Sequence, residues 1–123
     1  MISGIVSEEG VPTIIVPVAG QDWTAIIDTG FNGDLELPES LRGYVSERYV
    51  GQVTSALAGG QLIEEEAYQV HFPFDGEIVR ADATFAGDGD ILVGTRMLRQ
   101  YRLTVDFVDR SVTLDRLQSS GLP

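Results

Sequence analysis

An acidic tripeptide at the end of an apolar run is the feature of this sequence best suited to chemistry. Residues 26–33 read Ile-Ile-Asp-Thr-Gly-Phe-Asn-Gly, so Asp28 directly follows two β-branched residues. A carboxyl group at a strand end lies where burial and neighbouring charges can shift its pKa, which suits general acid or base catalysis. Asp-Thr-Gly is also compatible with an ordinary turn, so a purely structural role stays open.

Other candidates for chemistry are few. The chain has one histidine, His71, and neither cysteine nor lysine. This composition excludes thiolate catalysis and a lysine Schiff base, and it disfavours zinc. His71 is interpreted as an ordinary strand residue, because no Gly-x-Ser-x-Gly motif accompanies it. Asp88 and Asp90 are more typical of a solvated turn than of a calcium loop. We therefore expect no metal and no cofactor.

Composition limits the class of protein and its partners. The 123 residues fit one domain, 1–123, and 43% of them are hydrophobic, enough for a core. The net charge of −11 disfavours nucleic acid as a partner. No apolar run approaches the roughly 20 residues of a membrane helix. The N-terminus lacks the positive region of a signal peptide. We expect a soluble cytoplasmic protein that binds neither membrane nor nucleic acid.

The elements that must position Asp28 are predicted to be short strands between turn residues. Residues 101–107 alternate cleanly between apolar and polar side chains, as a half-buried strand does. The acidic run at 64–66 is predicted to be an exposed part of a long hairpin with Gly59 and Gly60 at its tip. Nine runs are expected to form strands: 2–6, 11–18, 23–28, 49–57, 61–72, 77–86, 91–93, 101–107 and 111–117.

Helix signals are weak. Residues 38–44 predict one or two turns, and residues 95–100 predict one short helix that Thr95 could cap. The fold class is therefore all-β with one short C-terminal helix. The segments 23–30 and 87–95 both contain an apolar strand that ends at a glycine. This similarity suggests a duplicated unit.

Three ordered motifs resemble those of the retropepsin-like aspartic proteases, the single-domain, retroviral-type relatives of pepsin. They are Asp28-Thr29-Gly30, then Leu57-Ala58-Gly59-Gly60, and finally Leu92-Val93-Gly94 before the helix at 95–100. The stretch "IIDTGFNGDLELP" is similar to a microbial branch whose motif is Asp-Thr-Gly-Phe. The resemblance covers about residues 11–117. It implies a retropepsin-like closed β-barrel with a flap hairpin, in a homodimer.

The resemblance also implies a mechanism and a role for each motif. Asp28 and its symmetry mate would activate a shared water for hydrolysis of an extended peptide. Thr29 would brace the two loops across the axis, and Gly30 would let the backbones approach. The remaining positions fall into two groups: substrate contacts at Phe31, Ala58, Gly59 and Gly60, and support of the acidic loop by Leu92, Val93 and Gly94. The N- and C-terminal strands would build the dimer sheet.

Phe31 departs from the small residue that is usual at this position in active family members. It could fill a substrate subsite, change the polarity around the acid, or turn inward as a core residue. We therefore keep two alternatives to the protease. One is an inactive dimerisation or peptide-binding module with the same fold. The other is an unrelated acidic β-barrel without a cleft.

Overall fold

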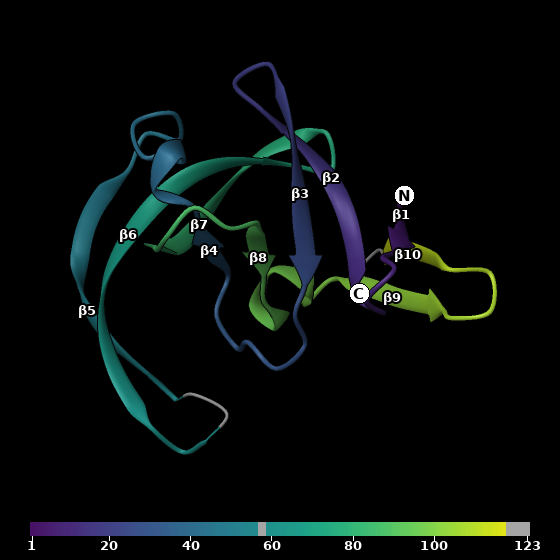
Figure 1. The fold of residues 1–123 in the computed structure, drawn as a ribbon. Coiled ribbons are helices and arrows are strands. Elements are labelled where there is room, and N and C mark those ends of the chain that lie inside the picture. Colours follow the sequence, from purple (N-terminus) through teal and green to yellow (C-terminus); the bar gives the residue numbers. More distant parts are fainter. Residues whose placement is uncertain (57–58, 118–123) are drawn as a thin grey trace, which may run out of the picture.

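The computed structural model describes residues 1–56 and 59–117 and forms one strongly curved sheet of ten strands (Figure 1). The strand order is β5-β6-β7-β4-β8-β3-β2-β1-β10-β9, which leaves β5 and β9 at the edges. The strands are β1 (Ile2–Val6), β2 (Pro12–Val18), β3 (Gln21–Ile27), β4 (Leu35–Leu37), β5 (Arg48–Ala56), β6 (Leu62–Phe74), β7 (Glu77–Phe85), β8 (Ile91–Val93), β9 (Tyr101–Asp106) and β10 (Ser111–Arg116). Two short 3-10 helices, η1 (Glu39–Leu41) and η2 (Thr95–Leu98), complete the described structure.

The all-β class is confirmed, because every run expected to be a strand forms one, with bounds shifted by a few residues. Local turn chemistry explains two of the hairpins. Ala19 and Gly20 have φ of 52° and 81° between β2 and β3, and Asp75 and Gly76 have 53° and 79° between β6 and β7. Two consecutive residues with positive φ match the twist of a tight hairpin.

The helix expected at 95–100 is shorter than predicted. The structure has only the four-residue η2, whose N-cap is Gly94 with no side-chain capping bond, so the cap expected from Thr95 is wrong. The physical reason is that main-chain contacts with the loop after β3 hold this end of η2. Within the described ranges, no helix is long and apolar enough to span a membrane.

The core is formed by alternate residues of the strands. β2 shows the pattern, because Ile14, Val16 and Val18 are buried while Ile15 is exposed. The same alternation corrects the expectation for the acidic run on β6. Glu64 and Glu66 are exposed, but Glu65 is half-buried because it points to the inner face of the hairpin.

The two similar segments of the sequence lie side by side at the centre of the sheet. β3 and β8 pair in parallel, with Ala25 opposite Ile91 and Ile27 opposite Val93. All four of these side chains are buried. Two strands far apart in the sequence thus end together at one point, and Asp28 follows directly from the end of β3.

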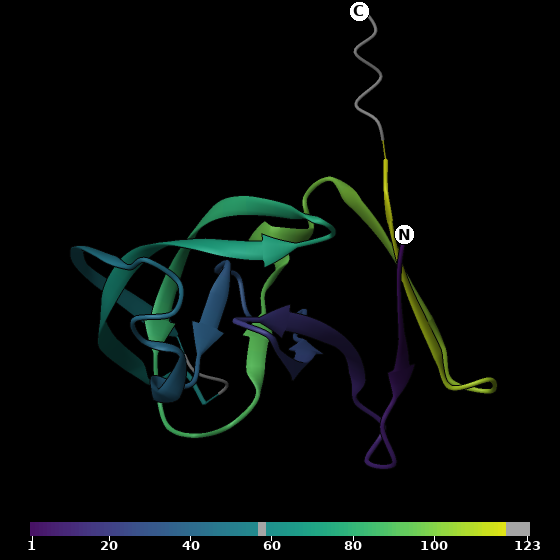
Figure 2. The same ribbon diagram turned by 90° about the horizontal axis from the view of Figure 1, so that it is seen from above.

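The terminal strands pair within one chain. β1 lies between β2 and β10, with Ile2 opposite Leu114, and β9 continues the sheet beyond β10. Figures 1 and 2 show the β9–β10 hairpin extending away from the rest of the molecule. The expected role of residues 2–6 and 111–117 in a dimer sheet therefore stays a prediction, and β9 is the edge strand at this end of the sheet.

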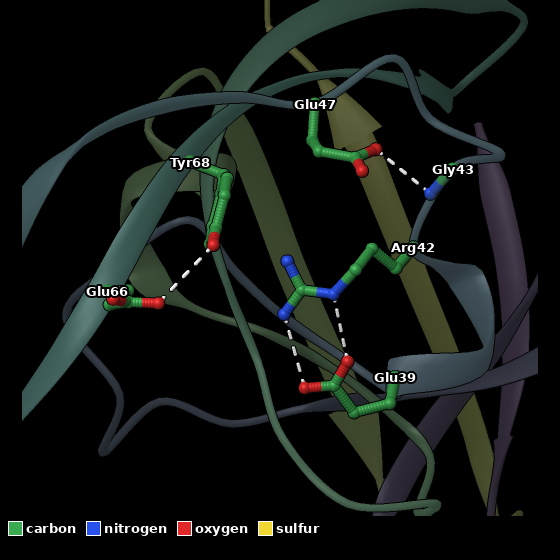
Figure 3. Close-up of polar contacts among 6 residues, drawn as sticks. All are labelled: Glu39, Arg42, Gly43, Glu47, Glu66 and Tyr68. Atoms are coloured by element: carbon green, nitrogen blue, oxygen red, sulfur yellow. Dashed lines mark hydrogen bonds and ion pairs between the residues drawn. The ribbon is translucent and has the colours of Figure 1, made fainter.

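The base of the β5–β6 hairpin is packed against η1 by one arginine. Arg42 forms two hydrogen bonds with Glu39, at 2.9 and 3.2 Å (Figure 3). Its guanidinium carbon also lies 4.9 Å from the ring centroid of Tyr68 and 4.3 Å from that of Phe85. Arginine over an aromatic face is a favourable contact, so Arg42 ties η1 to β6 and β7.

Candidate active site

Asp28 occupies the junction between β3 and an irregular loop that continues to β4. Its N–H donates to the Val93 carbonyl at 3.0 Å, which extends the parallel pairing with β8 by one step. Its Oδ1 accepts a hydrogen bond from the Gly30 N–H at 2.9 Å, and its carbonyl accepts one from the Phe31 N–H at 3.1 Å. Asp28 is half-buried as a residue, and the hydrogen bond from Gly30 fixes the direction of its carboxyl group. Thr29 and Gly30 are exposed beside it.

The loop that carries Asp28 is held by the start of η2. Three successive N–H groups donate to loop carbonyls: Gly94 to Asp34 at 2.9 Å, Thr95 to Phe31 at 2.8 Å, and Arg96 to Gly33 at 3.2 Å. The first N–H groups of a helix have no partner within the helix, so they are free to bind this loop. η2 therefore stabilises the loop through main-chain contacts, without a capping side chain.

Gly94 makes this close approach possible. A Cβ atom at Gly94 would lie 2.2 Å from the Gly33 oxygen and 2.7 Å from the Phe31 oxygen. The preceding residues are also positioned tightly, since Val93 is fully buried and Leu92 half-buried. Val93 and Gly94 thus contact the loop that carries Asp28, while the support expected from Leu92 stays a prediction.

Phe31 packs partly against its own loop. The ring lies over Gly33 and Gly94, where added Cβ atoms would lie 2.7 Å from Phe31 Cε1 and 2.8 Å from Phe31 Cδ2. The side chain is half-buried, and its remaining surface lines a cavity. The ring therefore turns partly inward, as one of the three interpretations expected, while its roles as a substrate subsite and in the polarity around the acid stay predictions.

The cavity lies between the Asp28 loop and the β5–β6 hairpin and has a volume of about 450 Å³. We call it the cleft. The loop contributes Gly30, Phe31 and neighbouring residues, and the hairpin contributes Val53, Thr54 and Ala56. Figure 1 shows the end of β5 and the start of β6 on the same side of the molecule as the loop after β3.

Gly59 and Gly60, the described residues of the hairpin tip, do not line the cleft in the single chain. Gly59 and Gly60 are exposed, and no atom lies within 4 Å of a Cβ built on either one. Gly60 has φ of +82°, as expected for a glycine at a turn. Leu57 and Ala58 lie outside the described residues. The substrate contacts expected from Ala58, Gly59 and Gly60 stay a prediction.

Two charged features around the loop that carries Asp28 were missed by sequence reasoning. Glu36 on β4 is half-buried, and burial raises its pKa, with Glu65 and Asp28 acting in the same direction. The register explains this arrangement, because Ile26 and Glu36 are both opposite Leu92 and so share a face of the sheet. No sequence signal pointed to Glu36, since only the order of strands in the sheet brings it there.

The second missed feature is a small ion-pair network at the other end of the loop. Asp34 is only 8% exposed, and its Oδ2 accepts a hydrogen bond from the Asp82 N–H at 2.9 Å. Arg96 Nε lies 4.0 Å from Asp34 Oδ1, and Arg96 Nη1 lies 3.5 Å from Asp82 Oδ2. These three residues come from three separate segments, so their proximity was not predictable from spacing.

His71 does not belong to this site. Its side chain is exposed on β6, and its N–H donates to the Val45 carbonyl at 2.8 Å. The structure thus places the histidine where the sequence interpretation put it, on an ordinary strand. Asp28 is therefore the candidate for chemistry, held by a loop that η2 fixes and that borders the cleft.

Solved structures of retropepsins match this chain in fold. A retropepsin-like aspartic protease from Rickettsia conorii gives a TM-score of 0.62 at 16% identity, over 92% of this chain and 88% of that chain. EIAV protease complexed with the inhibitor HBY-793 gives 0.57 at 19% identity, over 76% of this chain and 89% of that chain. The foamy viral protease-reverse transcriptase gives 0.58 at 18% identity, over 76% of this chain but 13% of that longer chain.

The chain has the retropepsin-like fold, so the resemblance drawn from three short motifs is confirmed at the level of the fold. No family model and no curated protein sequence matches it. At these sequence identities the likeness is one of fold alone. The activity of this chain has to be argued from its own residues.

Proposed function

We propose that this chain is an aspartic endopeptidase that acts as a homodimer on extended peptide segments. The observation that carries the proposal is the position of Asp28. Its carboxyl group is held by Gly30 at the end of β3, in a loop fixed by η2 and beside a cleft covered by a hairpin. This arrangement supports general acid–base chemistry on a ligand that enters the cleft.

Peptide hydrolysis by this route needs two carboxyl groups around one water, one as general base and one as general acid. Asp34 is unsuited to be the second acid, because it is buried and engaged by the Asp82 N–H. We therefore infer that a second copy supplies its own Asp28 at a twofold axis. Two close carboxyl groups resist simultaneous ionisation, so the pair would share a proton and titrate as a unit.

The other residues near Asp28 have roles that follow from their positions. Thr29 is exposed beside the acid, where its hydroxyl could contact the partner loop. The inner face of the hairpin, with Val53 and Glu65, would cover the peptide. An extended peptide in such a cleft would gain main-chain hydrogen bonds, as a strand added to a sheet does.

The proposal is tested by proteolysis of a diverse mixture of unstructured peptides from about pH 4 to 7, read by mass spectrometry of new termini. Asp28→Asn is expected to abolish cleavage, while Asp88→Asn, in an exposed turn, is expected to retain it. Activity per chain is expected to rise with protein concentration as dimers form. Full activity in Asp28→Asn would refute the assignment.

Phe31 favours a second candidate, a peptide-binding module without catalysis. Its ring covers Gly33 and Gly94 and lines the cleft, so a bulky apolar surface lies close to the acid. This candidate predicts a dimer that binds peptides in the cleft but leaves them intact. Phe31→Ala and Phe31→Ser would then be the informative variants, since gain of cleavage in either would identify the aromatic ring as the block.

A further inference from the structure

Half of the basic residues of this acidic chain surround one cavity. It has a volume of about 430 Å³ and lies between β7, η2 and the adjoining ends of β9 and β10. Its lining includes four of the eight arginines, Arg80, Arg96, Arg99 and Arg116. We call this cavity the arginine pocket. The net charge of the chain is −11, so this concentration of cations is a local exception.

Two of these four cations already have anionic partners. Arg116 pairs with Glu77, and Arg96 lies near Asp34 and Asp82, which also line the pocket. Across residues 1–56 and 59–117, neither Arg80 nor Arg99 forms an ion pair. Arg99 donates one N–H, from Nε, to the Arg96 carbonyl at 3.1 Å, which leaves the terminal groups of its guanidinium for a ligand.

The open edge of β7 adds a main-chain donor. The Asp82 N–H points away from β6, because it donates to Asp34. Main-chain groups alternate along a strand, so the N–H of Arg80 points to the same side. β4 pairs with β7 only from Ala83 onward, and the pocket borders the stretch before it. The pocket therefore offers a backbone N–H beside two unmatched guanidinium groups.

The arginine pocket adjoins the cleft. Asp34, Asp82 and Arg96 line both cavities, so these three residues form the boundary between them. A polypeptide that lies in the cleft and runs past the Asp28 loop would meet Arg96 first and then the open edge of β7. Asp34, Asp82 and Glu77 offset the charge of Arg96 and Arg116, so Arg80 and Arg99 are the cations left for a ligand. The Debye length is about 8 Å at physiological salt, so acids farther away than this act on them only weakly.

We propose that the arginine pocket binds the carboxylate side chains of an acidic polypeptide segment. Resting on the proposed function, it would select substrates with Asp or Glu several residues away from the bond that is cleaved. Carboxylate suits this site because a guanidinium group donates two parallel hydrogen bonds to it. The backbone N–H of Arg80 supplies a third donor, as it would to an added strand.

Binding can be measured without cleavage. The probe is a capped peptide of three Glu-Ser repeats, and the control is the matching peptide of three Gln-Ser repeats. Each is titrated at constant ionic strength into ¹⁵N-labelled protein. We expect saturable shifts of the amides of Arg80, Arg96 and Arg99 with the Glu peptide only. Arg80→Gln and Arg99→Gln are each expected to weaken binding about fivefold, and Arg102→Gln, an exposed arginine outside the pocket, to leave it unchanged.

The assignment is overturned if the Glu peptide gives no saturable shift at the pocket, or if Arg102→Gln weakens binding as much as the pocket variants. Equal affinity for inorganic phosphate would also overturn it, because the site would then take small anions rather than an acidic segment. The result is independent of catalysis. Binding without proteolysis would refute only the endopeptidase, and proteolysis without binding would refute only the pocket.

Discussion

Replacing Gly94 by alanine tests the contact that holds the Asp28 loop. Gly94 has φ of −92° and ψ of 176°, an extended conformation that alanine adopts without strain. At such a position Gly→Ala normally stabilises a protein by about 0.4–1 kcal/mol, because it restricts the unfolded chain. At Gly94, however, the new Cβ would lie 2.2 Å from the Gly33 oxygen and 2.7 Å from the Phe31 oxygen. Both obstacles are main-chain atoms, so a change of rotamer cannot relieve them.

The expected effect of Gly94→Ala is a net loss of stability. Overpacking costs about 1–3 kcal/mol, and each hydrogen bond lost contributes about 0.5–1.5 kcal/mol. If the loop moves enough to break two of the three bonds donated by the start of η2, the free energy of unfolding falls by about 2–4 kcal/mol after the unfolded-state gain is subtracted. For a domain of this size, that loss lowers Tm by roughly 10 °C.

Urea unfolding followed by circular dichroism measures this change, and Gly89→Ala provides the matched control. A Cβ at Gly89 meets no atom within 4 Å, so that variant is expected to be neutral or slightly stabilised. Catalytic activity of Gly94→Ala is expected to fall as well, since the displaced loop carries Asp28. If Gly94→Ala proved as stable as Gly89→Ala, close main-chain packing against η2 would not be what holds the Asp28 loop.

Three further predictions concern the carboxyl groups around the cleft. Glu36 has a raised pKa in the folded chain, mainly from burial, so its charged form destabilises the fold at neutral pH. Glu36→Gln should therefore be more stable than wild type at pH 7. The difference should close as the pH falls through the raised pKa of the folded state toward the ordinary value of 4.5, because Glu36 is then protonated in both states. Urea midpoints at several pH values measure this, and a difference that does not change with pH would contradict it. Asp34→Ala should lose about 1–3 kcal/mol, because the Asp82 N–H loses its buried acceptor, and thermal unfolding of this variant beside the exposed Asp88→Asn is the check. If Glu36 acts only through its charge on Asp28, Glu36→Gln should keep proteolytic activity with a shifted pH profile. Loss of all activity would instead make Glu36, rather than a second Asp28, the partner acid.

Much of the fold could be predicted because its signals are local. The alternation of apolar and polar residues on β9 can be recognised from neighbouring residues alone. The same is true of the apolar run that ends at Asp28. η2 was harder to predict, since a helix of four residues has little helical periodicity, and its start is held by carbonyls about sixty residues earlier in the chain. Glu65 was placed on the exposed surface because a run of three acids looks solvated, although alternation along β6 turns its middle member inward.

The sequence by itself determined which groups are available for chemistry: one Asp-Thr-Gly at a strand end, a glycine-tipped hairpin and a later Leu-Val-Gly, with no cysteine or lysine. It also determined the all-β class, since period-2 patterning depends on adjacent residues. Only the tertiary structure decided that Glu36 lies opposite Leu92, and that Asp34, Asp82 and Arg96 lie between two cavities. Those relations depend on the order and register of strands in the sheet, which are set by burial across the whole domain rather than by local sequence.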